Sequence, residues 1–213
     1  IEINCDEVPI MDGSAKNFLY ILKKTQTKKL TKKRKFLKIE NKVELVDGKR
    51  KISLEPGDGS LEIKFKLNYE NKVIGNQENT VNFNKDNLDD VSNSRTFCLY
   101  KDIEKIKKAG LAKGGSLDNA IVVDEEKVLN KEGLRNDKEF VNHKILDLLG
   151  DFVLSGHRVL GKVNCYQGGH QLTNMFLRKL LGDEKLKEFN EIKKIHIDDS
   201  FSKKSEAKIA INA

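Results

Sequence analysis

The sequence has no tryptophan, only two prolines and three cysteines, and no long apolar run. Cys5, Cys98 and Cys165 are far apart and odd in number, which fits free thiols in a reducing compartment. No stretch approaches the roughly 18 apolar residues of a membrane span, and no signal peptide opens the chain. We therefore expect a cytoplasmic protein without a transmembrane segment.

Charged residues are abundant, at 34% of the chain, and the net charge is +7 with an isoelectric point near 9.1. The excess is mainly lysine and clusters between Lys23 and Lys35, a run that we interpret as a solvated linker and an internal boundary. Such charge also attracts nucleic acid, anionic lipid headgroups or a phosphorylated substrate. No RNA-binding aromatic motif accompanies the run, so we expect no nucleic-acid partner and, at most, transient contact with a membrane surface.

The N-terminal residues predict a short strand followed by a short helix. Ile1–Cys5 alternates between apolar and polar residues, and Ala15–Lys24 has an apolar face and a cap at Asp12 or Ser14. The chain has no initiator methionine, and Ile1 begins inside the predicted strand. We therefore expect a fragment of a longer protein.

The region between residues 35 and 83 is typical of β-structure, with turn signals at Asp47-Gly48 and around Pro56. The clearest strand is Ser60–Tyr69, whose strict alternation predicts one buried and one exposed face. The other predicted strands are Phe36–Glu40, Val43–Val46, Lys51–Leu54 and, as an edge strand, Thr80–Asn84.

Residues 96–123 read as a β-α-β excursion. A helix at Ile103–Ala109 is stopped by Gly110, and a buried strand follows at Ala120–Val123. Between them Lys113–Ser116 forms a Gly-Gly turn, which could cradle an anion but is more often a plain turn.

The C-terminal third alternates helix, strand and helix. The predicted elements are a helix at Glu139–Asp151, a strand at Val159–Cys165 and a helix from His170 to the stop at Gly182. We expect a fraying helix and a loose charged tail in residues 183–213, with no function there.

The helix at Glu139–Asp151 is apolar on most sides and therefore predicted to be buried, with Asn136 and Glu139 as its capping pair. One stripe is polar: His143, Asp147 and Asp151 recur every four residues and so share a face. An imidazole and a carboxylate on successive turns can bind one Zn²⁺, although a catalytic site needs a third ligand. The alternative is an exposed hydrogen-bonded pair that arose by chance.

His170 stands where a Gly-Gly turn meets a helix N-terminus. The helix dipole disfavours an imidazolium there, but a nearby carboxylate such as Asp151 would offset that effect and make a usable acid. The alternative is a capping or surface histidine. His157 and His196 have no motif around them and are interpreted as structural.

Several stretches together resemble the zinc-dependent UDP-3-O-acyl-N-acetylglucosamine deacetylases of lipid A synthesis in Gram-negative bacteria. The resemblance extends over roughly residues 1–190, in the family's order and spacing. The matching segments are EVPIMDGSA (Glu7–Ala15), SRTF (Ser94–Phe97), GGSLDNAIVVD (Gly114–Asp124), LNKEGLRNDKEFVNHKILDLLGD (Leu129–Asp151) and GGHQLTN (Gly168–Asn174).

The resemblance implies a role for each matching residue. His143 and Asp147 match two zinc ligands. His170 matches the catalytic histidine that stabilises the oxyanion and protonates the leaving amine, Asp151 the carboxylate that orients it, and Thr96 a hydroxyl facing the tetrahedral intermediate.

The resemblance also implies substrate contacts. Lys144 matches a lysine beside the metal, and Tyr69, a softer match, sits where an aromatic residue lines the nucleotide region. Phe97 and the excursion that contains Ile103 and Ser116 match a βαβ insert that forms the acyl-chain passage.

The implied fold is α+β. Residues 1–30 would keep the last strand and helix of a first β-α-α-β domain, residues 31–190 would form the second β-α-α-β domain with its insert at about 96–123, and residues 191–213 would be a charged tail. The family's third zinc ligand and general base are an adjacent Glu-His pair, and no Glu-His dipeptide occurs in these 213 residues. The chain alone is therefore expected to bind zinc weakly and to be inactive.

The resemblance implies a hydrolase that uses Zn²⁺ to remove the N-acetyl group of UDP-3-O-acyl-N-acetylglucosamine, releasing acetate in the committed step of lipid A biosynthesis. We expect a monomer. The alternative is a non-catalytic module that binds a nucleotide sugar or a lipid headgroup with the same fold. A third and weaker alternative takes the lysine run as a nucleic-acid site, which salt-sensitive binding would support.

Overall fold

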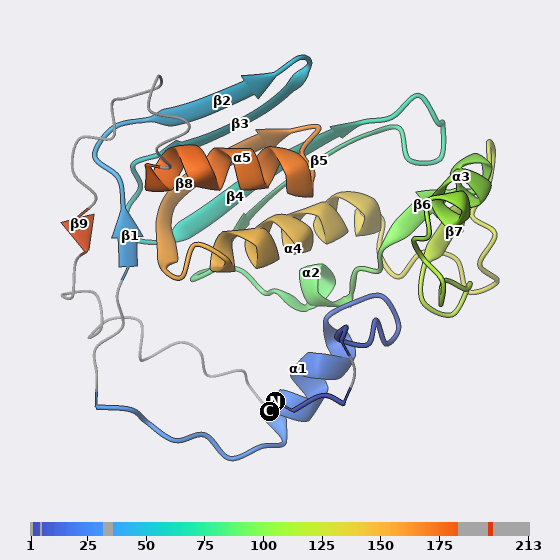
Figure 1. Cartoon of the computed structure of the whole chain (residues 1–213), viewed down its shortest axis with the longest axis horizontal. Helices are drawn as coiled ribbons and strands as arrows, with labels where there is room; N and C mark the ends of the chain where they lie inside the picture. Colours follow the sequence, from blue (N-terminus) through green and yellow to red (C-terminus); the bar gives the residue numbers. More distant parts are fainter. Residues whose placement is uncertain (1, 5, 32–35, 183–195, 198–213) are drawn as a thin grey trace.

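The computed structural model describes residues 2–4, 6–31, 36–182 and 196–197 (Figure 1). It shows an α+β fold, in which most strands come before the two long helices along the chain. Within these residues, no helix is long and apolar enough to cross a membrane.

The main sheet is built around strand β8 (Arg158–Tyr166). β8 pairs antiparallel with β3 and parallel with β4 and β1, while β2 lies outside β3, β5 outside β4, and β9 beside β1. The bounds of these strands are β1 (Phe36–Lys38), β2 (Val43–Asp47), β3 (Arg50–Glu55), β4 (Leu61–Asn68), β5 (Asn76–Asn82) and β9 (His196–Ile197). The predicted strands are thus present, and the predicted edge strand lies at an edge but runs from Asn76 rather than Thr80.

Two long helices, α4 (Glu139–Val153) and α5 (His170–Leu181), lie side by side on one face of this sheet (Figure 1). The alternation of β4 supplies the reason, because Ile63, Phe65 and Leu67 are buried while the intervening lysines are exposed. The core joins these strand residues to Phe140, Ile145, Phe176 and Leu180 from the helices. The helix that was predicted to be buried is therefore the central element of the core.

The predicted β-α-β excursion, called the insert below, forms a unit apart from the main sheet. β6 (Phe97–Leu99) and β7 (Ile121–Val123) pair in parallel, and the 3₁₀ turn η1 (Tyr100–Asp102) and helix α3 (Ile103–Lys108) connect them. Gly110, at φ +76°, ends the helix as predicted. A short helix, α2 (Asp89–Asn93), precedes the insert and was not predicted.

The predicted capping pair at the start of α4 is wrong. Asn136 accepts from the backbone N–H of Lys138, but the carboxylate of Glu139 accepts from the N–H of Arg135, one residue before the predicted cap, and not from that of Asn136. The same carboxylate binds Arg95, because a guanidinium that is buried in the core requires a carboxylate partner. The Val141 N–H at this helix end is satisfied from the sheet, by the side-chain oxygen of Gln77.

The N-terminal region differs from the prediction in one element. Helix α1 (Lys16–Lys23) forms as predicted, and the Ser14 hydroxyl accepts from the Lys16 N–H. The predicted strand at Ile1–Cys5 is wrong for residues 2–4, because no described strand lies beside them to accept their ladder bonds; Ile1 and Cys5 are outside the described residues. The predicted C-terminal helix and tail, residues 183–213, also fall outside the described residues except for β9.

The two long helices flank β8 in the sequence. After α1, the described order is five strands, α2, the insert, α4, β8 and α5. The two helices nevertheless form one layer, because α5 returns over β2 and β3 while α4 covers β4 and β5.

Candidate active site

The polar stripe of α4 lies on one face, as its spacing predicts. His143 is buried, with a side chain 9% exposed, and its Nε2 lies 3.3 Å from Oδ1 of Asp147. The other oxygen of Asp147 accepts a hydrogen bond from Lys144 Nζ at 2.9 Å. These three residues therefore form one compact charged cluster on consecutive turns.

Asp147 is held in its ionised form. Burial alone would raise the pKa of this carboxyl, but the hydrogen bond with His143 and the charges of His143 and Lys144 lower it well below its ordinary value. An ionised carboxylate and a neighbouring imidazole nitrogen together are suitable donors for a divalent cation such as Zn²⁺.

His170 and Asp151 meet where the C-terminal half of α4 passes the start of α5. His170 Nδ1 lies 2.9 Å and 3.0 Å from the two carboxylate oxygens of Asp151. The carboxylate only accepts, so Nδ1 carries the proton and Nε2 remains for chemistry. The His170 side chain is 70% exposed and that of Asp151 only 16%, so the packed helix fixes the carboxylate and the ring faces solvent.

Aromatic rings connect the cluster to the insert. The Phe97 ring meets the rings of Tyr69, Phe140 and His143 edge to face, at centroid distances of 6.0, 5.0 and 6.5 Å. Lys144 Nζ lies 5.4 Å from the centre of the same ring. Phe97 and Lys144 thus lie beside the candidate metal ligands, and Tyr69 is linked to them through the Phe97 ring.

Thr96 is fixed through its backbone. Its N–H donates to the Gly13 carbonyl and its carbonyl accepts from the Ile121 N–H, both at 2.8 Å. Gly13 has φ +80°, and a Cβ there would lie 2.1 Å from the carbonyl oxygen of Asn119, so only glycine fits this turn. The N-terminal turn and the insert therefore hold Thr96 between them.

The structure does not bring Ile103 or Ser116 to this cluster. Ile103 begins α3, and Ser116 is exposed in a loop where its hydroxyl accepts from the Asp118 N–H. Asn119 also binds across this loop, to the Ser116 N–H and the Gly114 carbonyl. The loop is thus a self-bonded turn, and its role in an acyl passage stays a prediction.

Sequence reasoning missed two buried residues beside the site. Arg95 and Glu139 form an ion pair at 2.8 Å with side chains 2% and 0% exposed. Arg95 lies between two residues of a recognised motif, but no local pattern links it to a residue 44 positions later. Glu139 was interpreted as a cap because it precedes an apolar helical run.

The described residues supply two metal donors, His143 and Asp147, at the cluster. Among them no group of three His, Cys, Asp or Glu side chains could hold a metal ion. Zn²⁺ accepts this imidazole and carboxylate pair, so the residues present fit part of a site.

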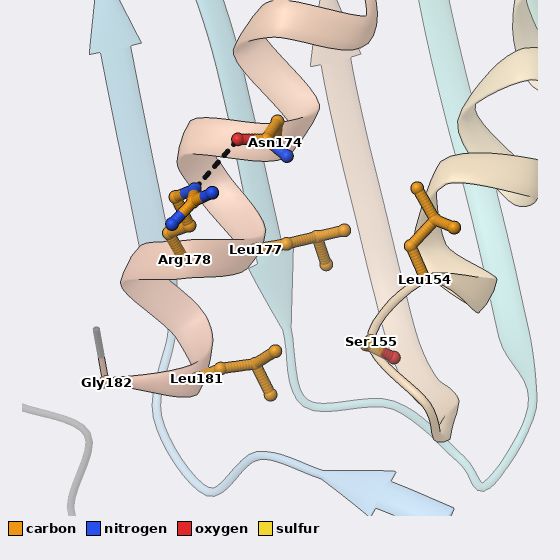
Figure 2. Close-up of a pocket in the computed structure, with 7 residues that line it drawn as sticks. All are labelled: Leu154, Ser155, Asn174, Leu177, Arg178, Leu181 and Gly182. Atoms are coloured by element: carbon orange, nitrogen blue, oxygen red, sulfur yellow. Dashed lines mark hydrogen bonds between the residues drawn. The ribbon is translucent and has the colours of Figure 1, made fainter.

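Hollows of similar size lie at different places in the fold, one beside the strands and one between the long helices. One, of about 460 Å³, lies at the hairpin ends and includes Tyr69 together with the cations Lys49, Arg50 and Lys101. The other, of about 420 Å³, lies between the ends of α4 and α5, where Leu177 and Leu181 project from α5 toward Leu154 (Figure 2). The second contains none of the predicted site residues.

Comparison with known proteins decides the family. The family model described as UDP-3-O-acyl N-acetylglycosamine deacetylase matches residues 1–182. The chain belongs to this family. It is 42% identical to the UDP-3-O-acyl-N-acetylglucosamine deacetylase of Pseudoalteromonas translucida and 39% identical to that of Haemophilus ducreyi.

These matches cover most of this chain but only part of the relatives. They extend over 86% and 89% of the chain, and over 61% and 63% of the two relatives. A deacetylase of the same name from Campylobacter fetus is 40% identical, with 87% and 63% covered. The chain therefore spans about three fifths of the length of the relatives it matches.

Proposed function

We propose that the chain is part of an enzyme that removes the acetyl group from UDP-3-O-acyl-N-acetylglucosamine by zinc-dependent amide hydrolysis. The observation that carries this proposal is the pairing on α4. His143 with Asp147 forms a candidate metal pair, and Asp151 with His170 forms a candidate acid one turn away. Four residues along a helix correspond to about 6 Å, which is within the span of one substrate group.

His143 and Asp147 would hold the zinc, with a third ligand from outside these 213 residues. Zinc bound there would supply Lewis acidity for attack on the acetamide. We assign the third ligand and the general base to the Glu-His pair of the family.

Residues of this chain would protonate the leaving amine and stabilise the negative charge on the acetamide oxygen. His170 enters the reaction protonated and oriented by Asp151, stabilises the negative charge that develops on the acetamide oxygen, and then protonates the departing amine. The Thr96 hydroxyl donates to the same oxygen. Lys144, which already binds Asp147, adds positive charge beside it. The products are acetate and the free amino sugar nucleotide.

We place the nucleotide in the hollow beside Tyr69. The Tyr69 ring can stack on the base of the nucleotide, while Lys49, Arg50 and Lys101 can bind its diphosphate. Phe97 lies between this hollow and the metal pair, because its ring contacts both Tyr69 and His143. The insert that begins at Phe97 would then guide the acyl chain, with Ile103 and Ser116 along it.

We propose residues 31–190 as the second β-α-α-β domain, with 1–30 as the remnant of a first domain and 191–213 as a tail. The ion pair between Asp12 and Arg135, at 2.8 Å, would join the first-domain remnant to the second domain. A cytoplasmic monomer with no nucleic-acid partner fits this substrate.

A binding module without catalysis is the competing proposal, favoured by the presence of only two metal donors among the described residues. The acid pair argues against it, because binding alone does not require an exposed histidine oriented by a carboxylate.

The test uses the complete product of the gene. We expect His170→Ala to lower kcat by about 10²- to 10⁴-fold, the usual contribution of a general acid, and to leave the zinc content unchanged. The matched control is His157→Ala, since the His157 ring bonds the Ser155 carbonyl in a local turn. Turnover near that of the native enzyme in His170→Ala would show that the assigned role is wrong.

A further inference from the structure

Two side chains of helix α4 bind the peptide group between Ser94 and Arg95, one at its N–H and one at its carbonyl oxygen. The Arg95 N–H donates to Oε1 of Glu139 at 3.0 Å. The Ser94 carbonyl oxygen lies 3.1 Å from Nδ1 of His143. Glu139 and His143 are four residues apart, so they project from the same face of the helix. One rigid planar unit therefore spans the distance between their side chains.

The carboxylate at one end of this unit is fully bonded. Besides the Arg95 N–H, Glu139 accepts from the Arg95 guanidinium at 2.8 and 3.2 Å and from the Arg135 N–H at 2.6 Å. The guanidinium is also bound by the Gly133 carbonyl at 2.7 Å and by Glu132 at 2.5 Å. Rotation of the peptide would break a buried, charge-assisted network, so its orientation is fixed.

The fixed carbonyl determines which nitrogen of His143 carries the proton. Both ring nitrogens of His143 face an acceptor, the Ser94 carbonyl at Nδ1 and the Asp147 carboxylate at Nε2, so both donate when the ring is doubly protonated. The Ser94 carbonyl cannot turn away, whereas the Asp147 carboxylate is a side chain with a second partner in Lys144. We therefore expect the neutral ring to keep its hydrogen on Nδ1 and to have its lone pair on Nε2, the nitrogen that faces Asp147. We infer that the Ser94–Arg95 peptide, held by the Arg95–Glu139 ion pair, is a clamp that sets the tautomer and ring orientation of His143 for metal binding. Arg95 and Glu139 are positioning residues, and the metal part of the inference rests on the proposed function.

Stability alone is a weak reason for such a pair. Buried ion pairs can often be replaced by apolar residues of similar volume without loss of stability, whereas groups that orient a metal-binding histidine affect affinity. Stability and positioning can therefore be separated by mutation.

The experiment observes His143 directly in this chain. Long-range ¹H–¹⁵N spectra of the imidazole rings distinguish a protonated ring nitrogen from one with a lone pair, and His143→Asn assigns the signals. At a pH where the ring is neutral, we expect Nδ1 to be protonated and Nε2 to be free. Adding Zn²⁺ should then shift Nε2 and leave Nδ1 protonated.

The decisive variant is Arg95→Met combined with Glu139→Leu, which removes both charges and keeps apolar volume. We expect it to fold, to show a mixture of His143 tautomers and to need about ten to a hundred times more Zn²⁺ for the same shift. Glu139→Gln keeps an oxygen for the Arg95 N–H and should retain more of the native tautomer. Phe176→Leu, in the core on α5, is the control for lost stability without loss of the clamp.

The outcomes separate the two proposals. The clamp is overturned if the native ring is not protonated on Nδ1, or if the folded double variant keeps the native tautomer. If the tautomers behave as expected but Zn²⁺ does not shift Nε2 even in the complete gene product, which supplies the proposed third ligand, the clamp stands and the proposed zinc site fails.

Discussion

Helix α4 takes part in two histidine–carboxylate pairs that share their chemistry and differ in their surroundings. The His143 side chain is 9% exposed, whereas that of His170 is 70% exposed. His143 is bonded to a buried backbone carbonyl, and that carbonyl belongs to a peptide fixed by an ion pair. His170 is bonded to one carboxylate at the rim. The same residue types are therefore built into a rigid site and an open one.

The difference fits the two proposed tasks. A metal ligand must be held in one orientation, since binding geometry depends on it. A general acid must reach the substrate and exchange its proton, so it must face solvent. The two histidines have the same chemistry, so the burial of their hydrogen-bond partners distinguishes the proposed metal ligand, His143, from the proposed general acid, His170.

The largest effect should come from breaking the rigid side. Glu139→Ala leaves the Arg95 guanidinium buried and without its main partner, which costs about 3–5 kcal/mol of the free energy of unfolding. Chemical denaturation of the chain measures it. The matched control is Glu132→Ala, which removes a carboxylate from the same guanidinium but at a side chain 56% exposed, and should leave the midpoint almost unchanged. Equal losses in the two variants would contradict the importance assigned to burial.

The sequence predicted the helices that carry these two pairs better than it predicted the residues that hold the pairs in place. The four-residue spacing placed His143, Asp147 and Asp151 on one face because a helix repeats every 3.6 residues, and the Gly-Gly turn placed His170 at a helix start. The alternation of β4 likewise predicted its buried face.

The supports could not be predicted, because they depend on contacts between distant segments. Glu139 looks like a capping residue from its neighbours alone, and only the fold shows that a buried arginine lies against it. The strand predicted at the N-terminus has the right local pattern but no described strand beside it, and pattern alone does not supply a pairing partner.

A smaller effect should come from the open side. In the complete gene product, Asp151→Asn removes the charge that favours protonated His170, so we expect kcat to fall about ten- to a hundredfold. Stability should change little, because His170 is exposed and the asparagine keeps the volume. The measurement is steady-state turnover together with the unfolding midpoint. A large loss of stability with normal turnover would show that the His170–Asp151 pair has a structural role and not the proposed role in proton transfer.

The smallest effect should appear in the pH dependence of stability at the buried pair. The pKa of Asp147 is lowered in the folded chain, although burial opposes this, because His143 and Lys144 favour its ionised form. A lowered pKa contributes stability above the ordinary carboxyl value near pH 4, and this stability is lost as the pH falls toward the lowered value. Native chain and Asp147→Asn should therefore differ by about 1–2 kcal/mol above pH 4 and converge in acid.

Asp58 supplies the matched comparison for this measurement. Its pKa is also lowered, through the hydrogen bond from Lys85 and the bonds from Ser60, but this ion pair is exposed. Because solvent screens exposed charges, Asp58→Asn should change the acid dependence less than Asp147→Asn does. Denaturant unfolding from neutral to acid pH tests both variants. A gap between the native chain and Asp147→Asn that stays constant in acid would show that His143 and Lys144 do not stabilise the charged carboxylate.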